Sequence, residues 1–146
     1  DTLNRSASMD DISEFTKEDT IKLGIIFADV NGLKYANDNY GQEAGDKLII
    51  DSVKLLKEHM TEKDQIYRLG GDEFVVVYHD IDQELFQQYV DALNESQKDK
   101  HLISFGAEWF ERLYNIDSAT KLSERRMYKQ KEEFYKTHSD FDRRSR

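Results

Sequence analysis

The chain has 146 residues, a length that suits one domain covering residues 1–146. It has no cysteine, which excludes a disulfide framework and thiolate chemistry, and no apolar run long enough for a membrane span or a signal peptide. Its formal net charge of −9 argues against general nucleic-acid affinity. We therefore expect a cytoplasmic domain without membrane contact, excised from a longer protein because it opens abruptly in DTLNRSA.

The elements expected along the chain alternate between helices and strands. A weak helix is predicted over residues 4–17, and the apolar run 21–30 is typical of a buried central strand. A short helix over residues 31–40 is expected to end at Gly41. The remaining predictions are an amphipathic helix over 42–60, a hairpin with strands 66–69 and 74–78, a helix over 82–97, a strand over 101–110 and a helix over 118–138.

This order of elements indicates the fold class. It corresponds to a βαββαβ core with an extra helix, which predicts an α/β (α+β) sandwich in which helices pack on a mixed sheet. The same order forms the core of palm-type nucleotidyl-transfer domains. In that arrangement the first strand runs beside the central hairpin.

The stretch YRLGGDEFVVVYH interrupts two predicted strands with two glycines and two carboxylates. Gly70 and Gly71 allow a tight reversal, which places Asp72 and Glu73 at the hairpin tip. Asp29 ends the first strand, and taken alone it would be interpreted as a cap of the next helix. In the palm arrangement it would join the other two carboxylates, which repel one another unless a cation lies between them. Oxygen ligands of this kind suit Mg²⁺.

The last predicted helix is basic. Residues 121–146 contain nine basic and five acidic residues, and Lys121, Arg125 and Lys129 recur at i, i+4 and i+8. Facing the carboxylates, this stripe would hold a triphosphate; facing water, it would be an ordinary solvated surface. Lys131 instead falls in the apolar arc of the helix, where an ammonium is costly unless it snorkels or finds an anion. The other members of that arc are Met127, Tyr128, Phe134 and Tyr135.

A second polar segment, GLKYANDNYGQEAGDK, follows the first strand. Asn37 and Asp46 are separated by the helix break at Gly41 and could point at one ligand. An amide and a carboxylate match the guanine edge, whereas adenine would leave the carboxylate without donors. The alternative is that the Asn and Asp residues at 37–39 are turn and capping residues.

Together these segments resemble the GGDEF domains, the diguanylate cyclases. The signature itself is GGDEF at Gly70–Phe74, preceded by Arg68. The other segments that resemble family motifs are LNR at 3–5, DVNGLKYANDNYGQEAGD at 29–46, ISFG at 103–106 and SERRMYKQK at 123–131. The resemblance spans nearly the whole chain, in order.

The resemblance implies a bacterial signalling enzyme, a nucleotidyltransferase that condenses two GTP molecules into cyclic di-GMP and pyrophosphate by two-metal phosphoryl transfer. Each domain holds one GTP, so a second copy is required in a catalytic homodimer, and an upstream sensor domain is expected; in a membrane-bound sensor this segment would be the cytoplasmic part. Mg²⁺ is the implied cofactor, with Mn²⁺ as an alternative. The implied metal ligands are Asp29, the Val30 carbonyl and Asp72; the catalytic residues are Asp72, Glu73 and Lys34; the substrate contacts are Asn37, Asp46, Gln42, Arg125 and Lys129.

Some positions depart from the family pattern. Gln42 stands where the family usually has His, Asn31 where Asp is commoner, and Ser123-Glu124 where Ala-Asp is usual. The product-inhibition motif Arg-x-x-Asp reads TEKD at residues 61–64. Because Thr61 cannot make the bidentate contacts of a guanidinium, we expect no feedback inhibition through this site.

Three functions fit the sequence to different degrees. The leading one is an active diguanylate cyclase, since the metal and guanine positions match. The main alternative is a catalytically silent module that binds GTP and regulates an attached domain or partner. A purely structural dimerisation domain is the third, and a rise in melting temperature with GTP would exclude it.

Overall fold

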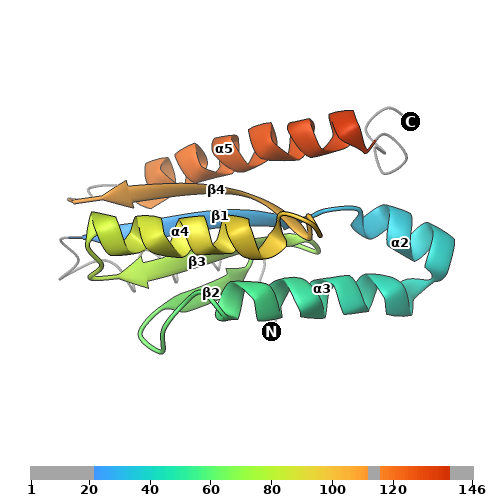
Figure 1. The fold of residues 1–146 in the computed structure, drawn as a ribbon, viewed down its shortest axis with the longest axis horizontal. Coiled ribbons are helices and arrows are strands. Elements are labelled where there is room, and N and C mark those ends of the chain that lie inside the picture. The colour runs from blue at the N-terminus through green and yellow to red at the C-terminus, as the bar shows by residue number, and fades with distance from the viewer. Residues whose placement is uncertain (1–21, 112–115, 139–146) are drawn as a thin grey trace.

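Residues 22–111 and 116–138 are described by a computed structural model. The helix predicted over residues 4–17 lies outside these ranges. The elements in chain order are β1 (Leu23–Val30), α2 (Leu33–Tyr40), α3 (Gln42–Lys57), β2 (Gln65–Arg68), β3 (Glu73–His79), α4 (Gln83–Gln97), β4 (Ile103–Phe110) and α5 (Ile116–Thr137) (Figure 1). Each of these elements was predicted, with bounds that differ by a few residues. No helix in the described ranges combines the length and the apolar character needed to cross a membrane.

The sheet has four strands in the order β2-β3-β1-β4. Each neighbouring pair of these strands is antiparallel, so the prediction of a mixed sheet is wrong. The physical reason lies in the crossover through α4. It joins β3 to β4, which run in the same direction but have β1 between them, so the two parallel strands do not share hydrogen bonds.

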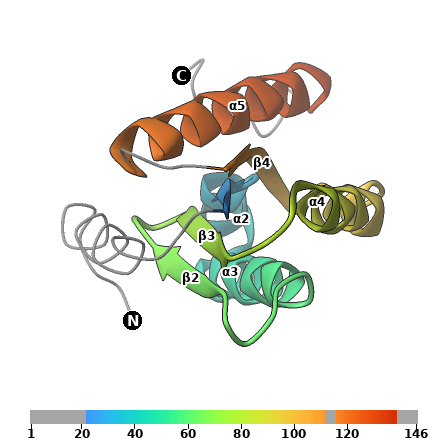
Figure 2. The same ribbon diagram turned by 90° about the vertical axis from the view of Figure 1, so that its left-hand side faces the viewer.

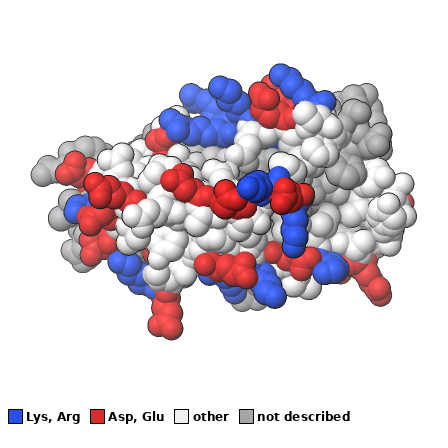
Figure 3. All heavy atoms as spheres, viewed as in Figure 1, with Lys and Arg blue, Asp and Glu red and all other residues white. Residues whose placement is uncertain are grey.

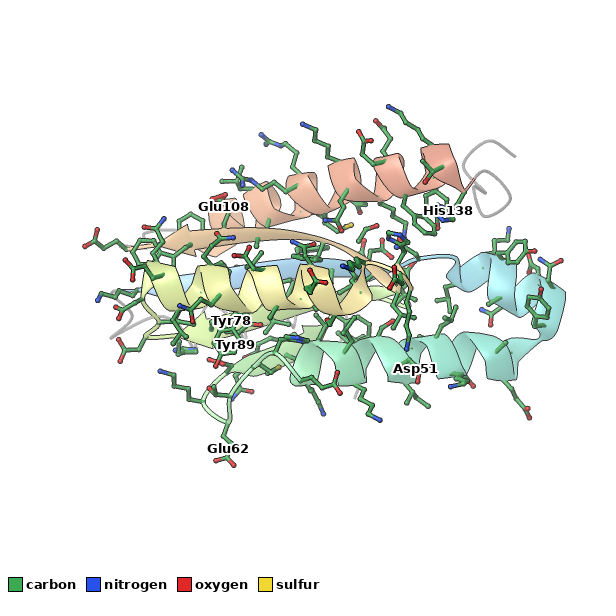
Figure 4. All side chains as sticks on the ribbon, in the orientation of Figure 1. Asp51, Glu62, Tyr78, Tyr89, Glu108 and His138 are labelled. Atoms are coloured by element: carbon green, nitrogen blue, oxygen red, sulfur yellow. The ribbon has the colours of Figure 1, made fainter. Side chains whose placement is uncertain are left out.

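Helices cover both faces of the sheet, as the end-on view in Figure 2 shows. α5 packs on one face through Met127, and α3 and α4 pack on the other, with Leu56 and Phe86 in the core there. This double cover explains why all of β1 is buried, as its continuous apolar run predicts. Tyr78 and Tyr89, labelled in Figure 4, pack with ring centroids 5.7 Å apart on the α4 side.

The alternation along β1 decides where Asp29 lies. Leu23, Ile25 and Phe27 belong to the core cluster on the α5 side, whereas Ile26 and Val30 belong to the cluster on the opposite side. Because successive strand residues point to opposite faces, Asp29 shares the α5 face. The last turns of a basic helix therefore lie over the buried carboxylate at the end of β1.

α5 lies very close to β4. A Cβ atom placed on Gly106 would lie 2.2 Å from the carbonyl oxygen of Ser123 and 2.6 Å from the backbone nitrogen of Met127. Only glycine permits this approach. An ion pair between Arg126 Nη2 and Glu108 Oε1, at 2.7 Å, adds a second link between the helix and the strand; Glu108 is labelled in Figure 4.

Candidate functional site

Asp29, Asp72 and Glu73 lie together at one edge of the sheet, as the predicted pairing of the first strand with the hairpin requires. Asp29 is directly opposite Glu73 in the antiparallel register of β1 and β3. The backbone N–H of Val30 donates to the carbonyl oxygen of Asp72 at 2.9 Å, which holds the hairpin turn against the end of β1. Asp72 lies in that turn, and its charge is close enough to raise the pKa of the Asp29 carboxyl.

Hydrogen bonds within the hairpin stabilise the turn that contains Gly70 and Gly71. The N–H of Leu69 donates to the carbonyl oxygen of Glu73 at 2.8 Å and closes the turn. Arg68 donates from Nε to the carbonyl oxygen of Gly70 at 3.1 Å and from Nη2 to that of Gly71 at 2.6 Å. The arginine before the signature thus fixes the backbone that presents Asp72.

Asp29 has a cationic partner from α5. Lys131 Nζ lies 2.8 Å from Asp29 Oδ1 and donates to the carbonyl oxygen of Val30 at 3.1 Å. The contact with Oδ1 has the distance of an ion pair without the angle of a hydrogen bond. The sequence indicated that Lys131 must either snorkel or find an anion, and in the structure it has an anion. What the sequence did not indicate is that the anion is Asp29.

Burial dominates the ionisation of Asp29, which is only 4% exposed. The pKa of its carboxyl is raised to about 7: removal from water is the largest cause, Lys131 opposes the shift, and the neighbouring Asp72 adds to it. A carboxylate held in so costly a position is typical of a functional site.

The oxygen atoms at this edge suit a hard divalent cation. The Asp29 carboxylate, the Val30 carbonyl and the Asp72 carboxylate are all oxygen donors, and Asp29 Oδ1 is buried without a hydrogen bond. Within residues 22–111 and 116–138, no group of three or more acidic or histidine side chains is arranged to hold a metal alone. A metal here would therefore need the carbonyl oxygen and further oxygens from water or substrate.

Tyr128 is a site residue that the sequence placed in the wrong environment. It was assigned to the apolar arc of α5, yet 46% of it is exposed. Its hydroxyl donates to Glu73 Oε2 at 2.9 Å, and partial burial together with this contact raises the pKa of the phenol. Tyr128 thus orients the second carboxylate of the signature.

The other predicted cations lie on the surface. Lys34 is exposed in the first turn of α2, and Arg125 is exposed on α5. Lys129 lines a groove of about 610 Å³ bounded by α4, β4 and α5. Figure 3 shows Lys and Arg side chains gathered over α5. The residue of α5 that contacts Asp29 is Lys131, and neither Arg125 nor Lys129 has a described contact with the carboxylates.

The predicted guanine readers come from adjacent helices. Asn37 on α2 packs over Gly45 of α3, because a Cβ on Gly45 would lie 1.8 Å from Asn37 Oδ1. Asp46 follows Gly45 in α3, and both Asn37 and Asp46 are exposed. Gln42 is exposed at the start of α3. Asn39 fits the alternative reading, since its amide donates to the carbonyl oxygen of Tyr35 at 2.9 Å.

The chain is similar to known proteins along most of its length. The model of the family described as diguanylate cyclase, GGDEF domain, matches residues 3–136. The chain is 39% identical over 72 residues to diguanylate cyclase DgcN of Escherichia coli K12, an alignment covering 49% of this chain and 18% of DgcN. It is 32% identical over 72 residues to the uncharacterized membrane protein SSP1970 of Staphylococcus saprophyticus, covering 49% and 20% of the two chains.

Solved structures show the same fold. The GGDEF domain of DgcB from Caulobacter crescentus, solved in complex with c-di-GMP, superposes with a TM-score of 0.74 at 16% identity. The superposition covers 90% of this chain and 84% of that one. The curated relatives are much longer, and the alignments span a fifth or less of their length.

Proposed function

This chain belongs to the GGDEF domain family, and we propose on that premise that it is a diguanylate cyclase, which condenses two GTP molecules into cyclic di-GMP and releases pyrophosphate. The observation that carries the proposal is the meeting of the Asp29 carboxylate, the Val30 carbonyl and the Asp72 turn at one sheet edge. A buried carboxylate oxygen without a hydrogen bond, such as Asp29 Oδ1, is costly to a domain with a purely structural role.

The proposed reaction centre is the edge of the sheet at which Asp29, Asp72 and Glu73 lie. Asp29, the Val30 carbonyl and Asp72 would hold Mg²⁺ or Mn²⁺, which supplies Lewis-acid chemistry at a phosphate and an attacking hydroxyl. Asp72 and Glu73 set the negative charge that attracts the cation, and Arg68 and Tyr128 fix their positions. Lys34, Arg125 and Lys129 supply positive charge for the triphosphate and the leaving pyrophosphate. Positioning and electrostatics carry most of such a reaction.

Asn37 and Asp46 are the proposed guanine readers. The Asp46 carboxylate would accept from N1–H and N2–H₂, and the Asn37 amide would donate to O6. Gln42 is expected beside the same ligand. Adenine presents no pair of donors to a carboxylate, so this arrangement favours GTP over ATP.

Two copies of the domain are needed, because one GTP is bound by each and the two must react with one another. We propose a homodimer in which the sites face each other. We also propose that the domain is the cytoplasmic output part of a longer signalling protein with a sensor domain upstream, and that it lacks feedback inhibition at residues 61–64.

Calorimetric titration with a non-hydrolysable GTP analogue tests the binding half of this proposal. We expect binding that requires Asp46 and strengthens with Mg²⁺ only while Asp72 is present, so Asp46→Ala and Asp72→Ala are the matched variants. Absence of binding by the intact chain would contradict the proposal. Binding without turnover in a forced dimer would instead indicate a catalytically silent GTP-binding module.

A further inference from the structure

A cation already occupies the proposed metal position. The ammonium of Lys131 is held by Asp29 Oδ1 at 2.8 Å and by the carbonyl oxygen of Val30 at 3.1 Å. These are two of the three protein oxygens assigned above to a divalent ion. The Lys131 side chain is only 12% exposed, so its charge is satisfied mainly by these protein oxygens.

The position of this ammonium is set by the packing of α5. Met127, one turn earlier, is fully buried on the sheet, and Gly106 lets the helix backbone lie directly on β4. Tyr135, one turn later, is buried, and its hydroxyl accepts from the N–H of Gly32 at 3.1 Å. The Tyr135 ring also lies 5.6 Å from Lys131 Nζ. α5 is therefore anchored on both sides of Lys131.

Two cations cannot share this position. Unit positive charges about 4 Å apart repel by several kcal/mol at the effective dielectric of a partly buried site, and a divalent ion doubles the effect. Both would compete for the same lone pairs of Asp29 and Val30. A metal ion can bind these two oxygens only after the ammonium has moved away.

We propose that Lys131 is an internal counterion that fills the Asp29–Val30 cation position in the metal-free protein, so that a divalent ion must displace it in order to bind. The inference rests on the proposed function, because it takes these oxygens as metal ligands. Metal alone binds weakly, and it binds well only together with a triphosphate, whose anionic oxygens attract the displaced ammonium.

The test measures Mn²⁺ binding to the purified 146-residue chain without nucleotide, from the electron paramagnetic resonance signal of free Mn²⁺ at pH 8. Lys131→Met removes the ammonium and keeps an unbranched apolar stem. We expect it to bind Mn²⁺ on the order of tenfold tighter than the unmodified chain, because a charge-assisted contact no longer opposes the metal. Lys136→Met, which removes an exposed charge from the same helix, should bind as the unmodified chain does.

Two further variants make the result specific. Lys131→Gln serves where Lys131→Met folds poorly by circular dichroism, since it also removes the charge. In the double variant Asp29→Asn/Lys131→Met the gain should disappear, which would place the gained affinity at Asp29. Equal or weaker Mn²⁺ binding by both folded Lys131 variants would overturn the inference, as would an equal gain in Lys136→Met.

A parallel titration with the GTP analogue separates the two proposals. One outcome is that Mn²⁺ binds the unmodified chain in the presence of nucleotide, while Lys131→Met shows no gain in Mn²⁺ affinity in the absence of nucleotide. In that case only the counterion inference fails. Should no variant bind Mn²⁺ under either condition, the proposed metal site fails and the counterion inference falls with it.

Discussion

Asp64 is bonded to Thr61 through two hydrogen bonds, from the Thr61 N–H at 2.8 Å and the Thr61 hydroxyl at 2.9 Å, both to Oδ2. Its other oxygen accepts from the backbone N–H of His79 at 3.2 Å, and the residue is buried. In the TEKD segment at residues 61–64, the place expected for the product-inhibition motif, this chain therefore uses the aspartate to cap a turn and to join that turn to the end of β3.

The first prediction concerns this capping role. Asp64→Ala should lower the free energy of unfolding by about 2 kcal/mol, because it leaves two backbone donors and a hydroxyl without their acceptor. It should not change the affinity for cyclic di-GMP. Chemical denaturation and calorimetry with cyclic di-GMP measure the two quantities, and Thr61→Val, which removes only the hydroxyl, is the milder control. Tight product binding lost in Asp64→Ala would refute the prediction.

The second prediction concerns pH. The folded state raises the pKa of Asp29 to about 7, mainly through burial, whereas the unfolded carboxyl titrates near 3.8. Between these values the folded protein holds a proton that the unfolded chain has lost, so stability falls as pH rises. In the presence of a metal chelator, the free energy of unfolding of the unmodified chain should therefore fall as the pH rises. The fall should be up to about 1.4 kcal/mol per pH unit relative to Asp29→Asn.

Denaturation curves at several pH values measure this difference. Asp51→Asn, which alters an exposed carboxylate paired with Lys47, should track the unmodified chain. A gap between the Asp29→Asn and unmodified curves that stays constant from pH 4 to pH 7 would contradict the assignment.

The third prediction separates stability from binding at the guanine site. In Gly45→Ala the new methyl group takes the place of the Asn37 amide, which must turn away. Since Asn37 is exposed, the movement costs little, and alanine favours the helix by about 0.5–1 kcal/mol over glycine. The variant should melt no lower than the parent and bind the GTP analogue on the order of tenfold more weakly.

The control for this prediction is Gly71→Ala, where an added Cβ has no atom within 4 Å. It lies in the signature turn, so it is compared by melting temperature alone. Unchanged nucleotide affinity in Gly45→Ala would show that Asn37 does not read the base.

The fourth prediction concerns Tyr128. Tyr128→Phe deletes the hydroxyl that donates to Glu73 Oε2 and keeps the ring. We expect turnover to fall on the order of tenfold, with the affinity for the GTP analogue and the melting temperature nearly unchanged, because the lost contact is exposed and orients a carboxylate. Tyr89→Phe, on α4, is the matched control. An equal loss of activity in both variants would exclude a specific role for Tyr128.

Much of the site could be predicted because its residues follow strand ends and glycines. The apolar run before Asp29 indicated a buried strand, and the glycine pair before Asp72 indicated the turn; the register of β1 and β3 then brings the two together. The position and pairing of β4 at the edge of the sheet were harder to predict. A helical crossover usually suggests adjacent parallel strands, and nothing in β3 or β4 shows that β1 lies between them.

The contacts of α5 could not be predicted for a related reason. A helical wheel shows which residues share a face, but not which face meets the sheet or how far along the helix it docks. Lys131 stood out as a charge among apolar residues, yet the identity of its anion depends on the approach that Gly106 permits. Tyr128 was taken as apolar because its ring fits the arc, although its hydroxyl reaches Glu73.

The most direct test of the central claim is turnover. The chain, fused to a parallel coiled coil that forces two copies together, is incubated with GTP and Mg²⁺, and cyclic di-GMP and pyrophosphate are quantified. We predict that both products form in a ratio of one to two, that Asp72→Ala abolishes them, and that ATP does not replace GTP. Intact GTP after incubation with a folded, dimeric, nucleotide-binding protein would contradict the assignment as a diguanylate cyclase.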